Sequence, residues 1–201
     1  MLVTMGLHPT GPETLRIAAG GGHNYVARGV HLLALAMQPP LLLGLLALTR
    51  RLRAHSSLAD LAMLAWGVAT VCVLIAGTAS GLVATRLADA VAASSGAERE
   101  WSLRLLHYTG TINQAFAALF TGFAGASVAL WSWVMRAPAA GFPRAAAWLG
   151  LVSGSAALMS LLAGALRLDV RGFGLVVVML AVWLTWVAIR LRQPTEPLAV
   201  R

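Results

Sequence analysis

The sequence predicts an all-α integral membrane protein, a bundle of five transmembrane helices, and three observations support this fold class. Charged residues make up only 11% of the 201 residues, whereas they make up about a quarter of a typical soluble domain. The mean hydropathy is +0.78. The apolar residues also gather in blocks of roughly 20, which is the helix length that crosses a bilayer.

Five blocks pass this length test. They cover residues 27–49, 58–84, 105–135, 145–166 and 172–190. The chain is therefore predicted to divide into an outer N-terminal segment over 1–26, a transmembrane bundle over 27–190 and a cytoplasmic tail over 191–201.

The N-terminal segment is expected to contain one short helix. In "TGPE", Thr10 precedes Glu13 by three residues, and Pro12 lies between them. This spacing is typical of a capping box with proline near the first helical position. Gly20 marks the expected end of the helix.

Two features kink or lengthen the predicted spans. Pro39 and Pro40 lie within the first span, and they should kink it because proline removes a backbone donor and clashes with the preceding turn. The stretch 85–104, between the second and third spans, is the longest connection. It is predicted to extend both helices beyond the membrane around an "SSG" turn.

The arginines set the predicted orientation. The motif "RRLR", with Arg50, Arg51 and Arg53, directly follows the first span, and cytoplasmic loops are enriched in such residues. The sequence thus predicts a multi-pass protein of the bacterial inner (plasma) membrane, with its N-terminus outside and its C-terminus cytoplasmic. The net charge of +8 comes mostly from arginines that bracket the spans, so the lipid bilayer is the expected partner and nucleic acid is not.

The third span separates small and polar residues from bulky ones when it is drawn as a helix. The small and polar stripe, expected to face the bundle, contains His107, Thr111, Gln114, Ala118, Thr121, Gly122, Gly125, Ala129 and Ser132. The opposite side, expected to face lipid, contains Tyr108, Ile112, Leu119, Phe123 and Leu130. Asn113 lies on the flank, where a bond to a neighbouring helix is expected.

The first and third spans share the pattern R-x2-H-x6-Q. It is formed by Arg28, His31 and Gln38, and again by Arg104, His107 and Gln114. Since both helices run from outside to inside, the two imidazoles are expected at similar depth near the outer surface. The second and fourth spans end in the related texts "TRLAD" and "LRLD". Helices one and two are therefore predicted to form a parallel repeat with helices three and four.

These residues predict a polar pocket near the outer face that binds a ligand, with haem b as one favoured cofactor. Two neutral imidazoles from facing helices can ligate haem iron, and the role would be an electron relay or a sensor. The arginines would pair with the propionates, and Gly110 would make room beside the ring. The candidate cofactor-binding residues are His31, His107, Arg28, Arg104, Gln38, Gln114 and Gly110.

Copper or zinc is the other favoured cofactor, because neutral imidazole suits both metals. The candidate metal ligands are His31, His107, His8 and His23, with Glu13 and Asp169 predicted on the same side. The spacing contains no compact ligand motif such as H-x3-H or C-x2-C.

Two other functions stay open from the sequence. A five-span bundle can bind or transport a small molecule or a lipid. Alternatively, the chain is a structural membrane subunit whose polar residues only pack helices. Enzymatic activity is also left open, and no catalytic residue is assigned, because no phosphate loop and no G-x-S-x-G motif is present.

Glycine pairs and tryptophans complete the expected architecture. The pairs Gly77 with Gly81 and Gly150 with Gly154 have GxxxG spacing, which predicts close helix packing inside one bundle. A homo-oligomer or a membrane partner subunit is left open. An aromatic belt at the membrane surfaces is predicted for Trp66, Trp131, Trp133, Trp148, Trp183 and Trp186, with Trp101 at the outer boundary.

Several stretches carry a family resemblance. "HPTG" near the start, "LLLGLLALTRRL" at the end of the first span and "LDVRGFG" before the last span resemble small polytopic proteins of bacterial inner membranes. The resemblance covers most of the chain and implies a membrane location. It implies no activity.

Overall fold

The computed structural model of the protein describes residues 11–20, 24–166, 168 and 170–192, and it is helical with no strand among them. The helices are α2 (Gly11–Ala19), α3 (Tyr25–Ala36), α4 (Gln38–Arg53), α5 (Leu58–Thr78), the π-helix η1 (Ala79–Val83), α6 (Ala84–Ala93), α7 (Gly96–Met135), the short 3-10 helix η2 (Pro138–Ala140), α8 (Arg144–Leu162) and α9 (Val170–Leu191). The expected N-terminal helix is confirmed as α2, with Gly20 directly after it.

Five stretches are long and apolar enough to cross a membrane, as the sequence predicts. They are Tyr25–Arg53, Leu58–Ala93, Gly96–Met135, Arg144–Leu162 and Gly172–Leu191. These helices are consistent with a multi-pass membrane protein.

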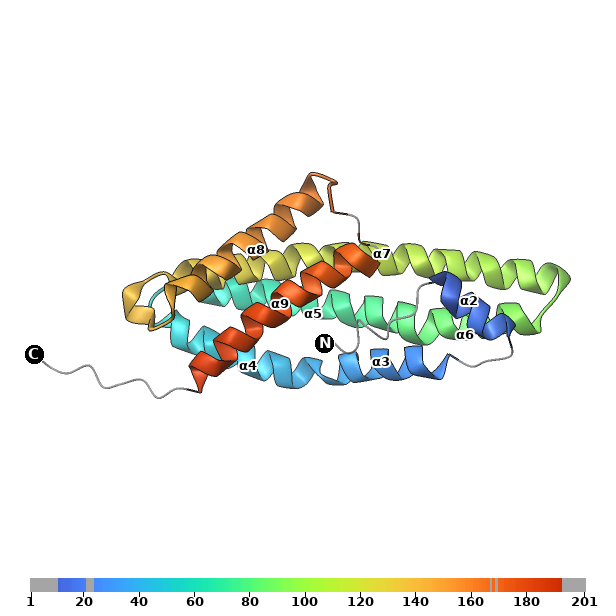
Figure 1. Cartoon of the computed structure of the whole chain (residues 1–201), viewed down its shortest axis with the longest axis horizontal. Helices are drawn as coiled ribbons and strands as arrows, with labels where there is room; N and C mark the ends of the chain where they lie inside the picture. The colour runs from blue at the N-terminus through green and yellow to red at the C-terminus, as the bar shows by residue number, and fades with distance from the viewer. Residues whose placement is uncertain (1–10, 21–23, 167, 169, 193–201) are drawn as a thin grey trace, which may run out of the picture.

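The second and third spans form a long antiparallel hairpin. The continuous rod α5–η1–α6 runs beside α7 (Figure 1), and the two are joined through Ser94 and Ser95. Gly96 follows with φ of 57°, a left-handed conformation that glycine adopts without a steric penalty. The predicted "SSG" turn is therefore confirmed. We call this end of the molecule the hairpin end.

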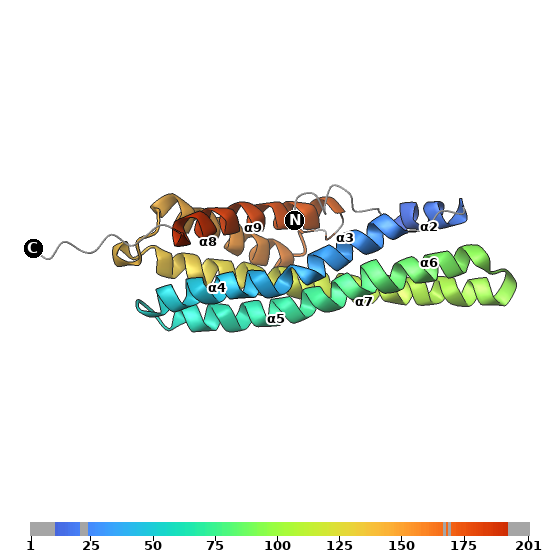
Figure 2. The ribbon, with the colours of Figure 1, turned by 90° about the horizontal axis from the view of Figure 1, so that it is seen from below.

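The hairpin extends well past the shorter helices. α7 has 40 residues, about 60 Å at the helical rise of 1.5 Å per residue, whereas the hydrocarbon core of a bilayer is about 30 Å thick. The ring centroids of Phe120 and Phe173 are 5.9 Å apart, so α9 begins beside the middle of α7. Figures 1 and 2 both show α8 and α9 along one half of α7, with α2 and α6 at the other half.

The first span is broken at the predicted place. α3 ends at Ala36 and α4 begins at Gln38, with Met37 between them and the prolines Pro39 and Pro40 in the first turn of α4. Proline has no backbone N–H, so the carbonyls one turn earlier lose their helical donors and the helix bends.

Three tryptophans form the centre of the core. Trp66, Trp131 and Trp183, from α5, α7 and α9, are buried. The Trp131 ring stacks on Trp183 at 6.3 Å between centroids, and its Nε1 donates a hydrogen bond to Thr49 Oγ1 at 3.1 Å. The predicted surface belt is wrong for these three residues, because helices cover their rings on all sides. Exposure fits a surface position for Trp101, Trp133 and Trp148.

The glycine pairs pack helices within the bundle, as predicted. A methyl group on Gly125 would lie 2.8 Å from the carbonyl oxygen of Gly154, so α7 and α8 meet backbone to backbone. A methyl group on Gly77 would lie 3.0 Å from the side chain of Leu35. A methyl group on Gly81 would overlap the ring of His31.

Candidate functional site

A polar cluster joins the first span to the second near the hairpin end. Asn24, Arg28 and His31 share one face of α3 and of the residue before it, because they are spaced four and three residues apart. Thr85 and Asp89 share one face of α6 through the same four-residue spacing. We call these five residues the α3–α6 polar cluster.

Hydrogen bonds close this cluster around Asp89. The guanidinium of Arg28 forms an ion pair with the Asp89 carboxylate, and its Nε donates to Thr85 Oγ1 at 3.0 Å. Nδ2 of Asn24 donates to the other Asp89 oxygen at 3.0 Å. The side chains of Arg28 and Asp89 are 25% and 30% exposed, so the pair is shielded from solvent on most sides.

His31 is buried against the π-helix. Its ring occupies the space that a side chain at Gly81 would need, and its Nδ1 lies 2.7 Å from the carbonyl oxygen of Ala27. A carbonyl oxygen can only accept, so Nδ1 carries the proton of this hydrogen bond. In a neutral imidazole, Nε2 then holds the lone pair. The wide turn of a π-helix is rare and is frequent at functional sites.

Gln38 is buried but lies outside this cluster. Its Nε2 donates to the carbonyl oxygen of Ala34 at 3.2 Å, within its own span and beside the break at Met37. This hydrogen bond stays within one turn of the same span and does not reach the second span. The structure gives this residue a local role that the repeat pattern does not reveal.

The candidate site residues of the third span do not face the bundle. His107, Gly110, Thr111 and Gln114 are exposed, so the predicted inward stripe is wrong in this half of α7. Arg104 pairs with Glu100 of its own helix at 3.7 Å, with both side chains about 70% exposed (69% and 72%). Within the described residues, no hydrogen bond, ion pair or ring contact joins His107 to His31.

Helix length explains this difference. About 20 Å of α7 separates His107 from Phe120, where α9 begins, so α8 and α9 do not cover this half of the helix. The side toward α6 carries the buried Ser102 and the half-buried Thr109 and Asn113. Beside α8 and α9, the predicted stripe is confirmed by the buried residues Thr121, Gly125 and Ser132.

The expected metal ligands are only partly described. His8, His23 and Asp169 lie outside the described residues, as does the side chain of Glu13. In the part of the chain that is described, no group of three or more His, Cys, Asp or Glu side chains could hold a metal ion together.

Sequence reasoning missed Asn24, Thr85 and the partner role of Gly81. The text "TRLAD" covers residues 85–89 and includes Arg86 and Asp89. Thr85 shares a helix face with Asp89, whereas Arg86 is exposed. One sequence feature could have identified these residues. Thr85 and Asp89 are spaced four residues apart, as are Asn24 and Arg28 in the first span. Only the structure shows that these two faces meet.

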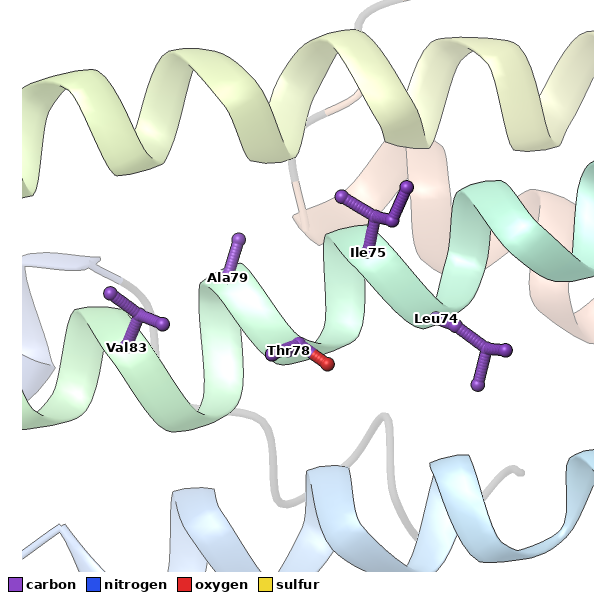
Figure 3. A pocket seen from close by; sticks show the side chains of 5 residues that line it. All are labelled: Leu74, Ile75, Thr78, Ala79 and Val83. Atoms are coloured by element: carbon purple, nitrogen blue, oxygen red, sulfur yellow. The ribbon is translucent and has the colours of Figure 1, made fainter.

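An apolar groove of about 360 Å³ lies along the surface of the second span. It is lined by Leu74, Ile75, Thr78, Ala79 and Val83, and Figure 3 shows these side chains along a single helical rod, with Ile75 and Ala79 directed toward α7. The groove is shallow and open. Its lining is typical of a surface that contacts lipid chains.

Comparisons with known proteins give no information on this site, so its interpretation depends on its geometry. No protein-family model, no curated protein and no solved structure matches the chain.

Proposed function

We propose that the chain is a structural subunit of the bacterial inner membrane that presents the α6–α7 hairpin to a partner subunit outside the cytoplasm. The α3–α6 polar cluster stabilises the bundle and performs no chemistry in this proposal. One observation carries it: the polar groups of the first span are bonded within the bundle, whereas their counterparts on α7 are exposed on a projecting hairpin.

The uncovered half of α7 supports recognition by another molecule. Trp101, Tyr108, Thr111 and Gln114 are exposed at different positions around this half of the helix, and the rings of His107 and Tyr108 meet edge to face at 6.4 Å. Exposed aromatic side chains with polar neighbours are typical of protein interfaces. Packing against other helices of the bundle does not explain these aromatic and polar side chains, because no helix in the described part of the chain covers them.

Site-specific photo-crosslinking in cells tests the proposal. A photoreactive amino acid at His107 or Gln114 should give a discrete adduct of higher mass on a denaturing gel. The matched control is Leu64, which is also exposed but lies within the apolar part of α5, and it should give no protein adduct. Equal adducts at all three positions, or none at the hairpin, would contradict the proposal.

A haem b or a copper or zinc ion bound by His31 and His107 is the second candidate. The hydrogen bond from His31 Nδ1 to Ala27 O supports it, because ligating histidines usually hold their second nitrogen in this way. Binding would require His107 to come from another copy of the chain or from a movement of α7. The parallel repeat of the two R-x2-H-x6-Q patterns also stays a prediction.

The absorption spectrum and metal content of the purified protein test this candidate. A bound haem should give a Soret band that is lost in both His31→Ala and His107→Ala, and a metal site should give about one copper or zinc per chain. A colourless, metal-poor protein from cells supplied with haem, copper and zinc would exclude this candidate, and the structural role would remain. Lipid binding along the apolar groove is compatible with either result.

A further inference from the structure

A stacked arginine lies at the end of the molecule opposite the hairpin. The guanidinium carbon of Arg136, directly after α7, is 4.4 Å from the ring centroid of Trp133 and 4.8 Å from that of Trp148 on α8. Both indoles are about half exposed, at 54% and 51%. The arginine thus lies over aromatic rings from two helices at the surface.

Stacking leaves the hydrogen-bonding edge of this arginine available. The two rings contact the guanidinium through cation–π interactions, whereas its N–H donors lie in the guanidinium plane. Phosphate oxygens bind to such an edge through two parallel hydrogen bonds. The indoles therefore orient Arg136 for an anion and reduce the rotamer entropy lost on binding.

The surroundings of Arg136 are basic. Arg144 begins α8 one turn before Trp148, on the same helix face, and the positive end of the α8 dipole lies there too. Arg51 stacks on Phe142 of the same connection at 4.9 Å. Among the described residues, none of these three arginines forms an ion pair, and the one carboxylate at this end, Asp60, is paired with Arg53 at 3.1 Å.

The position of this cluster selects the anion. It lies where α7 and α8, both candidate spans, meet their connection, and arginine and tryptophan at such ends lie at the level of the lipid headgroups. Basic clusters there attract anionic lipids. We propose that Arg136, placed over the rings of Trp133 and Trp148 and assisted by Arg144, binds the phosphate of an anionic phospholipid headgroup such as phosphatidylglycerol. This inference rests on the proposed membrane location.

Native mass spectrometry of the full chain in detergent, titrated with phosphatidylglycerol or phosphatidylcholine, tests the inference. The double variant Arg136→Gln/Arg144→Gln should bind phosphatidylglycerol about 30-fold more weakly, given roughly 1 kcal/mol for each basic residue at the headgroup level. The control Arg86→Gln/Arg99→Gln removes the same charge from exposed positions at the hairpin end. It should stay within about twofold of the unmodified chain.

A second variant separates stacking from charge. Arg136→Lys keeps the charge but loses the planar edge and the ring stacking, so phosphatidylglycerol binding should fall several-fold while the thermal unfolding temperature stays close to that of the unmodified protein. Equal losses in the test and control double variants, or no preference over phosphatidylcholine, would overturn the inference. Competition by inorganic phosphate at equal concentration would also overturn it, because the site would then take free phosphate.

Failure of this inference can be distinguished from failure of the proposed membrane location. A chain that is not inserted in the membrane would be released by alkaline carbonate, without detergent. A chain that stays inserted but shows no lipid selectivity removes only the lipid site. Crosslinking at the hairpin end reports on the partner and does not depend on either result.

Discussion

At the scale of single residues, Arg28 shows that the neighbouring helices determine which partner an arginine binds. Its sequence context is almost the same as that of Arg104, since each lies three residues before a histidine and ten before a glutamine. Arg28 nevertheless connects two helices through Asp89 and Thr85, whereas Arg104 reaches only Glu100 of its own helix. The difference arises because α3 packs against η1, which brings Arg28 within reach of Asp89 and Thr85 on α6, whereas Arg104 is exposed on its helix.

The ion pair at this position should be measurable as a coupling energy. Arg28→Gln and Asp89→Asn should each lower the free energy of unfolding in detergent micelles by about 1–2 kcal/mol, because each leaves a partly buried partner unsatisfied. The double variant should lose less than the sum, with a coupling of roughly 1 kcal/mol. Arg104→Gln, the control, should change stability by no more than about 0.5 kcal/mol. Additive losses would show that the two side chains do not stabilise each other.

At the scale of elements, local chemistry predicts breaks and turns well. Pro39 and Pro40 act on the backbone of their own turn, and Gly96 adopts its left-handed φ directly after the two-residue connection Ser94 and Ser95. These effects need no distant partner, so the sequence is sufficient for them. The π-helix at Ala79–Val83 has no such local signal, and it coincides with the place where His31 packs on Gly81.

The sequence predicts only in part which face of α7 is buried. Its small and polar stripe faces the bundle at Thr121, Gly125 and Ser132, but His107 and Gln114 on the same stripe are exposed. A helical wheel compares residues around one axis and contains no information on where the neighbouring helices end. Because α8 and α9 reach only the middle of α7, the same face is covered at one end and open at the other.

At the scale of the whole molecule, the two ends differ in charge and in shape. The end opposite the hairpin carries Arg50, Arg51, Arg53, Arg136, Arg144, Arg190 and Arg192. The hairpin end carries acidic residues as well, among them Asp89, Glu98 and Glu100. Positive charge at the ends of spans favours the cytoplasmic side. The proposed orientation therefore places the hairpin outside and the arginine-rich end in the cytoplasm.

Cysteine labelling in intact cells measures this orientation. In a Cys72→Ala background, Ser95→Cys in the hairpin turn should react with a membrane-impermeant maleimide. Ala139→Cys, in the connection between α7 and α8, should react only after the cells are opened. Both side chains are exposed, so access to the reagent is the only intended difference. Labelling of Ala139→Cys alone in intact cells would reverse the orientation.

The sequence by itself determined the helical class, the five apolar spans, the proline break and the hairpin turn. Each of these depends on hydropathy or on backbone chemistry within a few residues, and both can be read along the chain. Only the tertiary structure decided which polar groups are enclosed: Arg28 and His31 are covered by α6 and η1, whereas Arg104 and His107 are not. The physical reason is that the burial of a side chain depends on the lengths and directions of the neighbouring helices. The spacing of residues within one helix carries no information about either.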